Sequence, residues 1–209
     1  MIVASLHVGT PRRETFPSGT LLTGGAKASV AGAMLRFDGF EGDGVADHRH
    51  HGGPDRTACV YPAEHYAWWS SVHGWTLRFG AFSENLTVEG AREGEIWIGD
   101  IVRIGKALAQ VTLPRDPCPT IDRVTNIPSL HRMARESGRC GFHMRTLEEG
   151  LVQAGDIFEV VARNPSGISV AAVLDLYHGR SSDRELRRRL QEMPEFADEG
   201  KRELARRLG

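Results

Sequence analysis

The sequence is poor in cysteine, and its few cysteines lie far apart. Cys59, Cys118 and Cys140 are the three cysteines of the 209-residue chain, and no two of them form a CxxC pair. An odd count at long spacing argues against a disulfide framework, an iron–sulfur cluster and a zinc ribbon. The chain also lacks a G-x-G-x-x-G fingerprint after a strand, so no dinucleotide-binding site is predicted. The sequence shows no flavin-binding motif either.

Excess charge and long apolar runs are lacking as well. The formal net charge is -1, so no global basic field indicates nucleic acid and no acidic excess indicates disorder. No apolar run approaches the ~20 residues that span a bilayer. The opening "MIVASLHVG" begins without a basic n-region and includes His7, which is typical of a first strand and not of a signal peptide. We therefore expect a cytoplasmic protein that binds neither a membrane nor a nucleic acid duplex.

What the sequence does contain is many short β-branched segments, separated by 24 glycines and 10 prolines. The segments typical of strands are IVASLHV, ASVAGAMLRF, ACVYP, EIWIGDIVRIG, ALAQVTL and DIFEVVAR. Helices are predicted over residues 62–74, with Pro62 early and Gly74 at the end, and over residues 129–138. Many strands and few helices favour a β-rich α+β fold built on a barrel, not a doubly wound sheet.

The composition changes after Arg163, where the linker "NPSG" leads into a segment with helical periodicity only. We therefore predict a β-barrel domain over residues 1–163 and a three-helix C-terminal domain over residues 164–209. The first tail helix carries an apolar stripe at i, i+3, i+4 and i+7, made of Val170, Val173, Leu174 and Tyr177. Three short helices are marginal alone, so they should pack on the barrel or on a second subunit, which leaves a homodimer possible.

The second tail helix carries a capping-box signature. Ser182 is predicted as its N-cap, with Glu185 three residues later. The third tail helix is predicted to open with Pro194. Three consecutive arginines, residues 187–189, resemble a nucleic-acid signal, but acidic residues are interleaved throughout, as on a solvated helix face.

The densest chemical signal is "TLPRDPCPTIDR", residues 112–123. Pro117 and Pro119 restrict the backbone on both sides of Cys118. Arg115 and Arg123 bring positive charge near the thiol, which favours the thiolate, the form that acts as nucleophile and metal ligand. The alternative interpretation is a turn that holds a small buried hydrophobic residue.

A second dense stretch is "HRHHGGPDR", residues 48–56. Its histidines suggest zinc, but no further His or Cys follows at finger spacing. Gly52 and Gly53 allow the backbone to approach a ligand, their N–H groups can cradle an anion, and Arg56 adds charge. The alternative is a polar glycine-rich turn that leads into the next strand.

Two further motifs are weaker. "GAFSENL", residues 80–86, places Glu84 and Asn85 beside a glycine-led turn, as pocket wall or as turn chemistry only. "SGRCGF", residues 137–142, closes a helix and places Arg139 where it could reach a phosphate or cap the last carbonyl groups.

The order of these motifs resembles that of the MOSC domain family, relatives of the C-terminal part of molybdenum cofactor sulfurase. The resemblance rests on four blocks, GDGVADHRHHGGPDRTACVYPAEHYAWW, GAFSENLTVEG, IGDIVRIGKALAQVTLPRDPC and SGRCGFHMRTLEEGLVQAGD. The tail resembles that of the family's YiiM-like branch. One departure is Ser83, which stands where a glycine is expected and could narrow the cleft locally.

The resemblance implies a MOSC-type β-barrel with a polar cleft and a molybdopterin-type molybdenum cofactor, with Cys118 as the molybdenum ligand. It also carries a family-level association with pyridoxal phosphate. A soft metal centre suits a thiolate, and the pterin phosphate needs cationic or N–H donors. His51 or Glu84 could supply protons. The candidates for holding the cofactor are Arg115, Gly52, Gly53, Arg56, Asn85 and Arg139.

Three functions remain open at this point. The first, which the resemblance implies, is molybdenum-dependent reduction of N-hydroxylated compounds: members of this branch are linked to detoxifying hydroxylaminopurine-type base analogues. It needs a separate flavin or iron–sulfur reductase as electron donor. The second is a non-catalytic molybdopterin or sulfur carrier. The third is a metal-free enzyme with Cys118 as nucleophile and a histidine as base. Bound molybdenum would exclude the third, and turnover of a hydroxylamine would separate the first from the second.

Overall fold

The structure is a computed structural model, and it describes residues 1–48 and 51–208. Arg49 and His50 of the histidine-rich stretch lie outside the described residues. The strands are β1 (Ile2–Val8), β2 (Arg12–Phe16), β3 (Gly19–Thr23), β4 (Ala28–Val30), β5 (Gly32–Arg36), β6 (Gly39–Phe40), β7 (Ala58–Pro62), β8 (Leu86–Glu89), β9 (Ile101–Ile104), β10 (Ala107–Pro114), β11 (Phe142–Glu148), β12 (Gly150–Gln153) and β13 (Phe158–Ala162).

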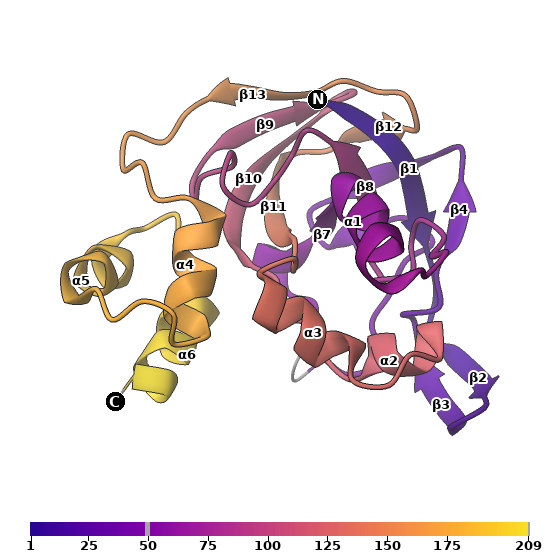
Figure 1. The fold of residues 1–209 in the computed structure, drawn as a ribbon. Helices are drawn as coiled ribbons and strands as arrows, with labels where there is room; N and C mark the ends of the chain where they lie inside the picture. The colour runs from indigo at the N-terminus through magenta and orange to yellow at the C-terminus, as the bar shows by residue number, and fades with distance from the viewer. Residues whose placement is uncertain (49–50, 209) are drawn as a thin grey trace.

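The helices lie between and after these strands. They are the 3₁₀ helix η1 (Pro54–Arg56) and the α-helices α1 (Glu64–His73), α2 (Thr120–Thr125), α3 (Leu130–Ser137), α4 (Val170–Tyr177), α5 (Arg184–Glu192) and α6 (Asp198–Leu208). Figure 1 shows α1, α2 and α3 on one side of the strands and α4, α5 and α6 on another. In the part of the chain that the structure describes, no helix is both long and apolar enough to cross a bilayer.

The strands form one large mixed sheet with two small ones beside it. The large sheet has the order β13-β9-β10-β11-β7-β8-β1-β4, antiparallel except for the parallel pair β7 and β8. It curls so that β1 returns close to β13, where Val3 N–H donates to Asp156 O (2.9 Å) and Phe158 N–H donates to Met1 O (3.0 Å) (Figure 1). The β-rich α+β class is confirmed, but the sheet is not closed into a complete barrel.

Side-chain alternation along the strands builds the main core. On β10, Ala107, Ala109 and Val111 are fully buried, whereas Leu108 and Gln110 between them are half-buried. Burial of apolar surface is the dominant favourable term in folding, and it fixes the register of such a strand. The inner face of the sheet is thus set by the two-residue period of the sequence.

A second apolar cluster lies under the helices next to the Cys118 segment. Tyr61 of β7, Trp69 of α1 and Phe82 are buried together with Ile121 of α2 and Leu130 of α3. Tyr61 and Phe82 stack with ring centroids 4.2 Å apart. Because Ile121 is anchored in this cluster, the first turn of α2 has a fixed position on the sheet.

The tail packs on the sheet, which is one of the two surfaces expected for it. Its predicted stripe is buried and belongs to the same core as the strands. Backbone hydrogen bonds fasten it to the sheet domain at the start of α4, from Val170 N–H to Ile96 O (2.9 Å), and just before α6, from Ala197 N–H to Thr112 O (3.2 Å). The tail and the sheet share this core. The division into two domains at residue 163 stays a prediction.

The N-cap of α5 differs from the prediction. The cap is Asp183, not Ser182: the Asp183 carboxylate accepts a hydrogen bond from Leu186 N–H (2.9 Å). A carboxylate at this position also interacts favourably with the helix dipole. The third tail helix begins at Asp198, four residues after the predicted start at Pro194.

Of the two candidate cap residues, only Asp183 should contribute to stability as the N-cap of α5. We expect Asp183→Ala to lower the free energy of unfolding by about 1 kcal/mol, because the first turn of α5 loses an acceptor. The matched control Ser182→Ala should change it by less than about 0.5 kcal/mol. Urea denaturation measures both values, and the reverse order would show that Ser182 is the cap.

Candidate functional site

Two adjoining cavities meet at Cys118. An inner cavity of about 300 Å³ lies between the Cys118 segment and the turn that follows β3, and an outer cavity of about 580 Å³ lies between that segment and the tail. The residues that line both cavities are Leu21, Asp47, His51, Arg56, Asp116, Cys118 and Thr120. A group that reacts at the sulfur of Cys118 can thus be approached from two sides.

The Cys118 thiol is half-buried and held largely as a thiolate. Burial alone would raise its pKa, but hydrogen bonds from His51 and from Thr120, through its side chain and its backbone N–H, lower the pKa to about 6. The sequence suggested that the flanking arginines lower the pKa of Cys118. In the structure, the lower pKa comes mainly from His51 and Thr120. By contrast, burial raises the pKa of Cys59 to about 11, and it also raises that of Cys140.

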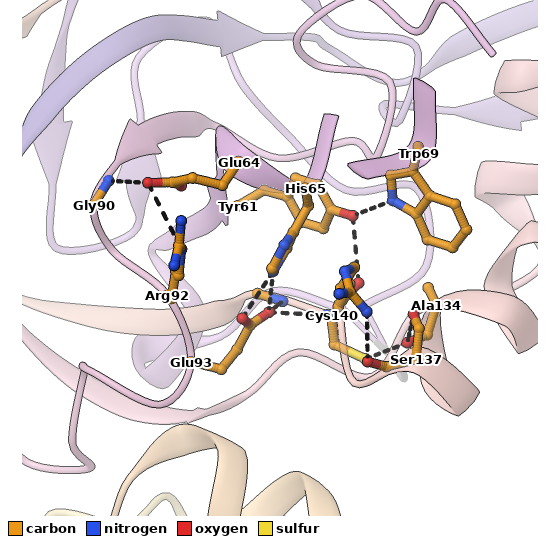
Figure 2. A network of polar contacts seen from close by, with 12 residues as sticks. Tyr61, Glu64, His65, Trp69, Gly90, Arg92, Glu93, Ala134, Ser137 and Cys140 are labelled. Carbon is orange, nitrogen blue, oxygen red and sulfur yellow. Dashed lines mark hydrogen bonds and ion pairs between the residues drawn. The ribbon is translucent and has the colours of Figure 1, made fainter. Parts of the chain in front are cut away.

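The backbone before Cys118 is anchored to a buried carboxylate. Arg115 N–H donates to Gly141 O (3.0 Å), and Glu93 accepts from the N–H groups of Cys140 (3.0 Å) and Gly141 (2.8 Å). His65 Nε2 lies 2.8 Å from the same carboxylate (Figure 2). Burial would raise the pKa of Glu93, but the hydrogen bond with His65 and those from the backbone lower it, so the anchor is ionised. This network fixes the strand end from which the Cys118 loop departs.

The inner cavity offers cationic donors at low exposure. Arg115 is 7 % exposed, and its Nη1 is buried without a hydrogen-bond partner among the described residues. Lys27 is also buried and forms an ion pair with Asp43. A Cβ on Gly25 would lie 3.0 Å from Ser83 Oγ and 3.1 Å from Thr120 Cγ2, so glycine keeps this wall open.

Ser83 is a strained feature of the inner wall. Its φ is 60°, in the left-handed region that favours glycine, which explains why a glycine is expected there. Its hydroxyl is buried without a partner among the described residues. The side chain faces Gly25, so it narrows the inner cavity at one point.

The structure brings most of the candidate residues to this cleft. Cys118, His51, Gly52, Arg56, Asn85 and Arg115 line the inner cavity. Asn85 is occupied within the wall: its amide donates to Asp43 Oδ2 (2.8 Å) and accepts from Cys59 N–H (3.0 Å). Its role in the structure is to hold the wall together.

Glu84, Arg139 and Gly53 do not line either cavity. Glu84 is fully buried and accepts hydrogen bonds from Tyr66 Oη (2.6 Å), Gly80 N–H (2.8 Å) and Thr87 Oγ1 (2.7 Å). The Arg139 guanidinium lies 3.7 Å from the ring centroid of Trp68. Glu84 therefore braces the wall from behind, and Arg139 points to the α1 side of the sheet.

Several lining residues are not predicted from the sequence. Lys27 of the inner wall comes from a turn with no motif of its own, except that Gly24 and Gly25 precede it. Asp43 lies in the first of the four family blocks but is not among the predicted site residues. His143 of β11 lines the inner cavity, and burial lowers its pKa well below the ordinary value, so its ring is neutral. A histidine inside a strand carries no local signal that separates a core position from a site.

The tail forms the far wall of the outer cavity. Arg56 of η1 pairs with Glu199 of α6 (2.7 Å), and Asp116 pairs with Arg207 of α6 (2.6 Å) and with Arg135 of α3 (2.7 Å). Asp116 stands two residues before Cys118. The two ion pairs with α6 fasten the tail beside the Cys118 segment.

A protein-only metal site is not present in the described part of the chain, since no three His, Cys, Asp or Glu side chains there are grouped to hold a metal ion. A metal that an organic cofactor carries has ligands of its own, so a single side-chain ligand such as Cys118 suits it.

Comparison with known proteins decides the family. The MOSC domain model matches residues 47–159, which include the Cys118 loop and most of the sheet. The chain belongs to the MOSC domain family. MOSC domains are associated with the molybdenum cofactor.

Relatives place this MOSC protein in the YiiM-like branch. It is 40% identical over 169 residues to the uncharacterized protein YflK of Bacillus subtilis, covering 80% of this chain and 76% of that one. It is 34% identical over 162 residues to YiiM of Escherichia coli, covering 76% and 72%. A more distant relative, named "Reductase", of Gibberella moniliformis is 30% identical over 117 residues, which are 54% of this chain and 21% of that one.

The fold agrees with a solved structure of the same branch. The crystal structure of YiiM from Geobacillus stearothermophilus superposes with a TM-score of 0.82 at 26% identity, over 100% of this chain and 99% of that one. The match includes the helical tail, so sheet and tail occur together in both proteins.

The ionised thiol can be tested by alkylation of the cofactor-free protein. The rate of Cys118 labelling by iodoacetamide should rise with pH through a midpoint near 6 and level off above it, because only the thiolate reacts. His51→Ala should move the midpoint upward, since it removes a hydrogen bond to the thiolate. Mass spectrometry follows the label, with Cys118→Ser as the unlabelled control, and a midpoint of about 8 or above in the wild type would contradict the geometry.

Proposed function

We propose that this MOSC protein reduces N-hydroxylated compounds, with the molybdenum cofactor in the inner cavity. The observation that carries the proposal is the position of Cys118, at the junction of two cavities. One side can hold a cofactor, and the other remains open to a substrate. The relative named "Reductase" supports an oxidoreductase, although this chain matches only a fifth of it.

The residues of the inner cavity fit such a cofactor. The Cys118 thiolate is a soft donor of the type that a molybdenum centre prefers. The buried Nη1 of Arg115 has no partner among the described residues, and it can donate to a phosphate or a pterin oxygen. Lys27 and the open backbone at Gly25 and Gly52 complete the anion-binding side. When bound, the cofactor supplies a metal centre that accepts oxygen and exchanges two electrons.

The protein must supply protons and orientation. Reduction of R–NH–OH to R–NH₂ breaks the N–O bond, consumes two electrons and two protons, and releases the oxygen as water. His51 lines both cavities and hydrogen-bonds to the thiolate, so it can hold a proton beside the reacting oxygen. Glu84 is not assigned this role, because it lies behind the wall.

The electrons must come from a separate protein. The sequence has no dinucleotide fingerprint and no cysteine cluster for an iron–sulfur relay. We infer that a flavin or iron–sulfur reductase docks transiently at the mouth of the cleft. Such an encounter is steered by charge and weakens as salt rises.

A non-catalytic molybdopterin or sulfur carrier is the second candidate. It needs only the inner cavity and the Cys118 thiolate, both of which are present. The outer cavity favours catalysis, because a carrier has no need of a second chamber that opens on the same sulfur. The hydrogen bond between His51 and Cys118 would also suit a metal-free cysteine enzyme, which would not depend on molybdenum.

Turnover of the molybdenum-loaded protein tests the proposal. With reduced viologen as donor, we expect steady reduction of hydroxylaminopurine, and with NADH or NADPH alone we expect none. The amine product is measured by chromatography. Turnover with pyridine nucleotide alone would show an unrecognised cofactor, and no turnover with viologen and fully loaded protein would favour the carrier.

A further inference from the structure

We propose that Tyr177, the last residue of α4 in the helical tail, binds the substrate by donating a hydrogen bond to it in the outer cavity. The inference rests on the proposed function and extends it to the tail. It assigns part of the substrate site to a segment that the sequence presents as a packing element only.

Tyr177 lines the outer cavity, and its hydroxyl is buried without a hydrogen-bond partner among the described residues. The residue as a whole is 5 % exposed. The charges that act on this hydroxyl are those of Glu203, Arg207, Arg56 and Asp116, all of which line the same cavity. A buried hydroxyl left unpaired is costly, so a ligand group that accepts from it gains free energy.

The hydroxyl acts as a donor. Burial raises the pKa of Tyr177, and the nearby Glu203 carboxylate raises it further, so the phenol keeps its proton. An acceptor such as a ring nitrogen, a carbonyl oxygen or the oxygen of an N-hydroxyl group suits it.

The charged groups around Tyr177 satisfy one another. Glu199 pairs with Arg56, and Arg207 pairs with Asp116 and also with Glu203. Tyr177 adds a neutral hydrogen-bond donor beside these paired charges, which suits an uncharged, hydrogen-bonding substrate. Leu113, Pro114 and Pro119 provide apolar surface in the same cavity for a flat ring.

Tyr177 is also held at a fixed distance from the thiol. Arg207 Nη1 donates to Tyr177 O (2.7 Å), and Arg207 Nη2 donates to Asp116 Oδ2 (2.6 Å). One guanidinium thus connects the end of α4 to the residue two positions before Cys118. Because the Tyr177 hydroxyl and the Cys118 thiol are already positioned relative to each other, little conformational entropy is lost when the substrate binds.

The test uses Tyr177→Phe in the molybdenum-loaded full chain, with hydroxylaminopurine as the probe. We expect unchanged molybdenum content, an unchanged or slightly higher melting temperature, and a KM raised about 3- to 10-fold with kcat little changed, as for one lost neutral hydrogen bond. Equilibrium binding of hydroxylaminopurine, measured by calorimetry, should weaken by the same factor.

The matched control is Tyr61→Phe. The Tyr61 hydroxyl is buried too, but it accepts from Trp69 Nε1 (2.9 Å) and lies away from both cavities. This variant should lose stability and keep the wild-type affinity for hydroxylaminopurine.

The outcomes separate the two proposals. If the wild type binds hydroxylaminopurine but viologen gives no turnover, the reductase proposal fails, while calorimetry still tests Tyr177. Wild-type affinity in Tyr177→Phe, or a loss of stability like that of Tyr61→Phe, would overturn the assignment to Tyr177. Absence of saturable binding by the wild type would overturn it as well.

Discussion

The site depends on a half-buried thiolate that the protein stabilises with hydrogen-bond donors close by. Burial works against the charge on Cys118, and hydrogen bonds from His51 and Thr120 outweigh it. Those donors are effective only if the loop holds its position. The loop leaves β10 next to Arg115, whose N–H is bound to the segment that Glu93 anchors, and it enters α2, which is fixed by Ile121 in the second apolar cluster. The sheet and helices thus act together to hold one sulfur atom in place.

The cleft is built from parts of the chain that lie far apart in sequence. Its inner side comes from the turn after β3, η1 and β11, and its outer side from α4 and α6 of the tail. The pairs of Arg56 with Glu199 and of Asp116 with Arg207 tie the two sides together. The tail therefore does more than cover apolar surface: it is continuous with the core and also completes the chamber outside Cys118.

Local sequence signals predict the helices that have clear start and stop residues. The remaining elements, and most residues of the cleft, depend on tertiary contacts. Helices α1 and α3 end at Gly74 and Gly138, both left-handed, as their sequences predict. The hairpin β2–β3 and the six-residue α2 are missed, because polar strands and single helical turns have no distinctive period. Cys118 is found from its proline-fixed context, whereas Lys27 and Tyr177 reach the cleft only through the fold. No local pattern distinguishes them from a surface lysine and a core tyrosine.

The central claim is that Cys118 binds the metal of the cofactor. The most direct measurement is the molybdenum-to-protein ratio of Cys118→Ser and wild type, both purified from a host that makes the cofactor, with Cys140→Ser as a control for loss of a buried thiol. Serine is nearly isosteric but is a hard, protonated ligand, so Cys118→Ser should keep its circular dichroism spectrum and lose its molybdenum. Cys140→Ser should retain the metal, because Cys140 is buried and lines neither cavity. A folded Cys118→Ser protein that carries wild-type molybdenum would contradict the account.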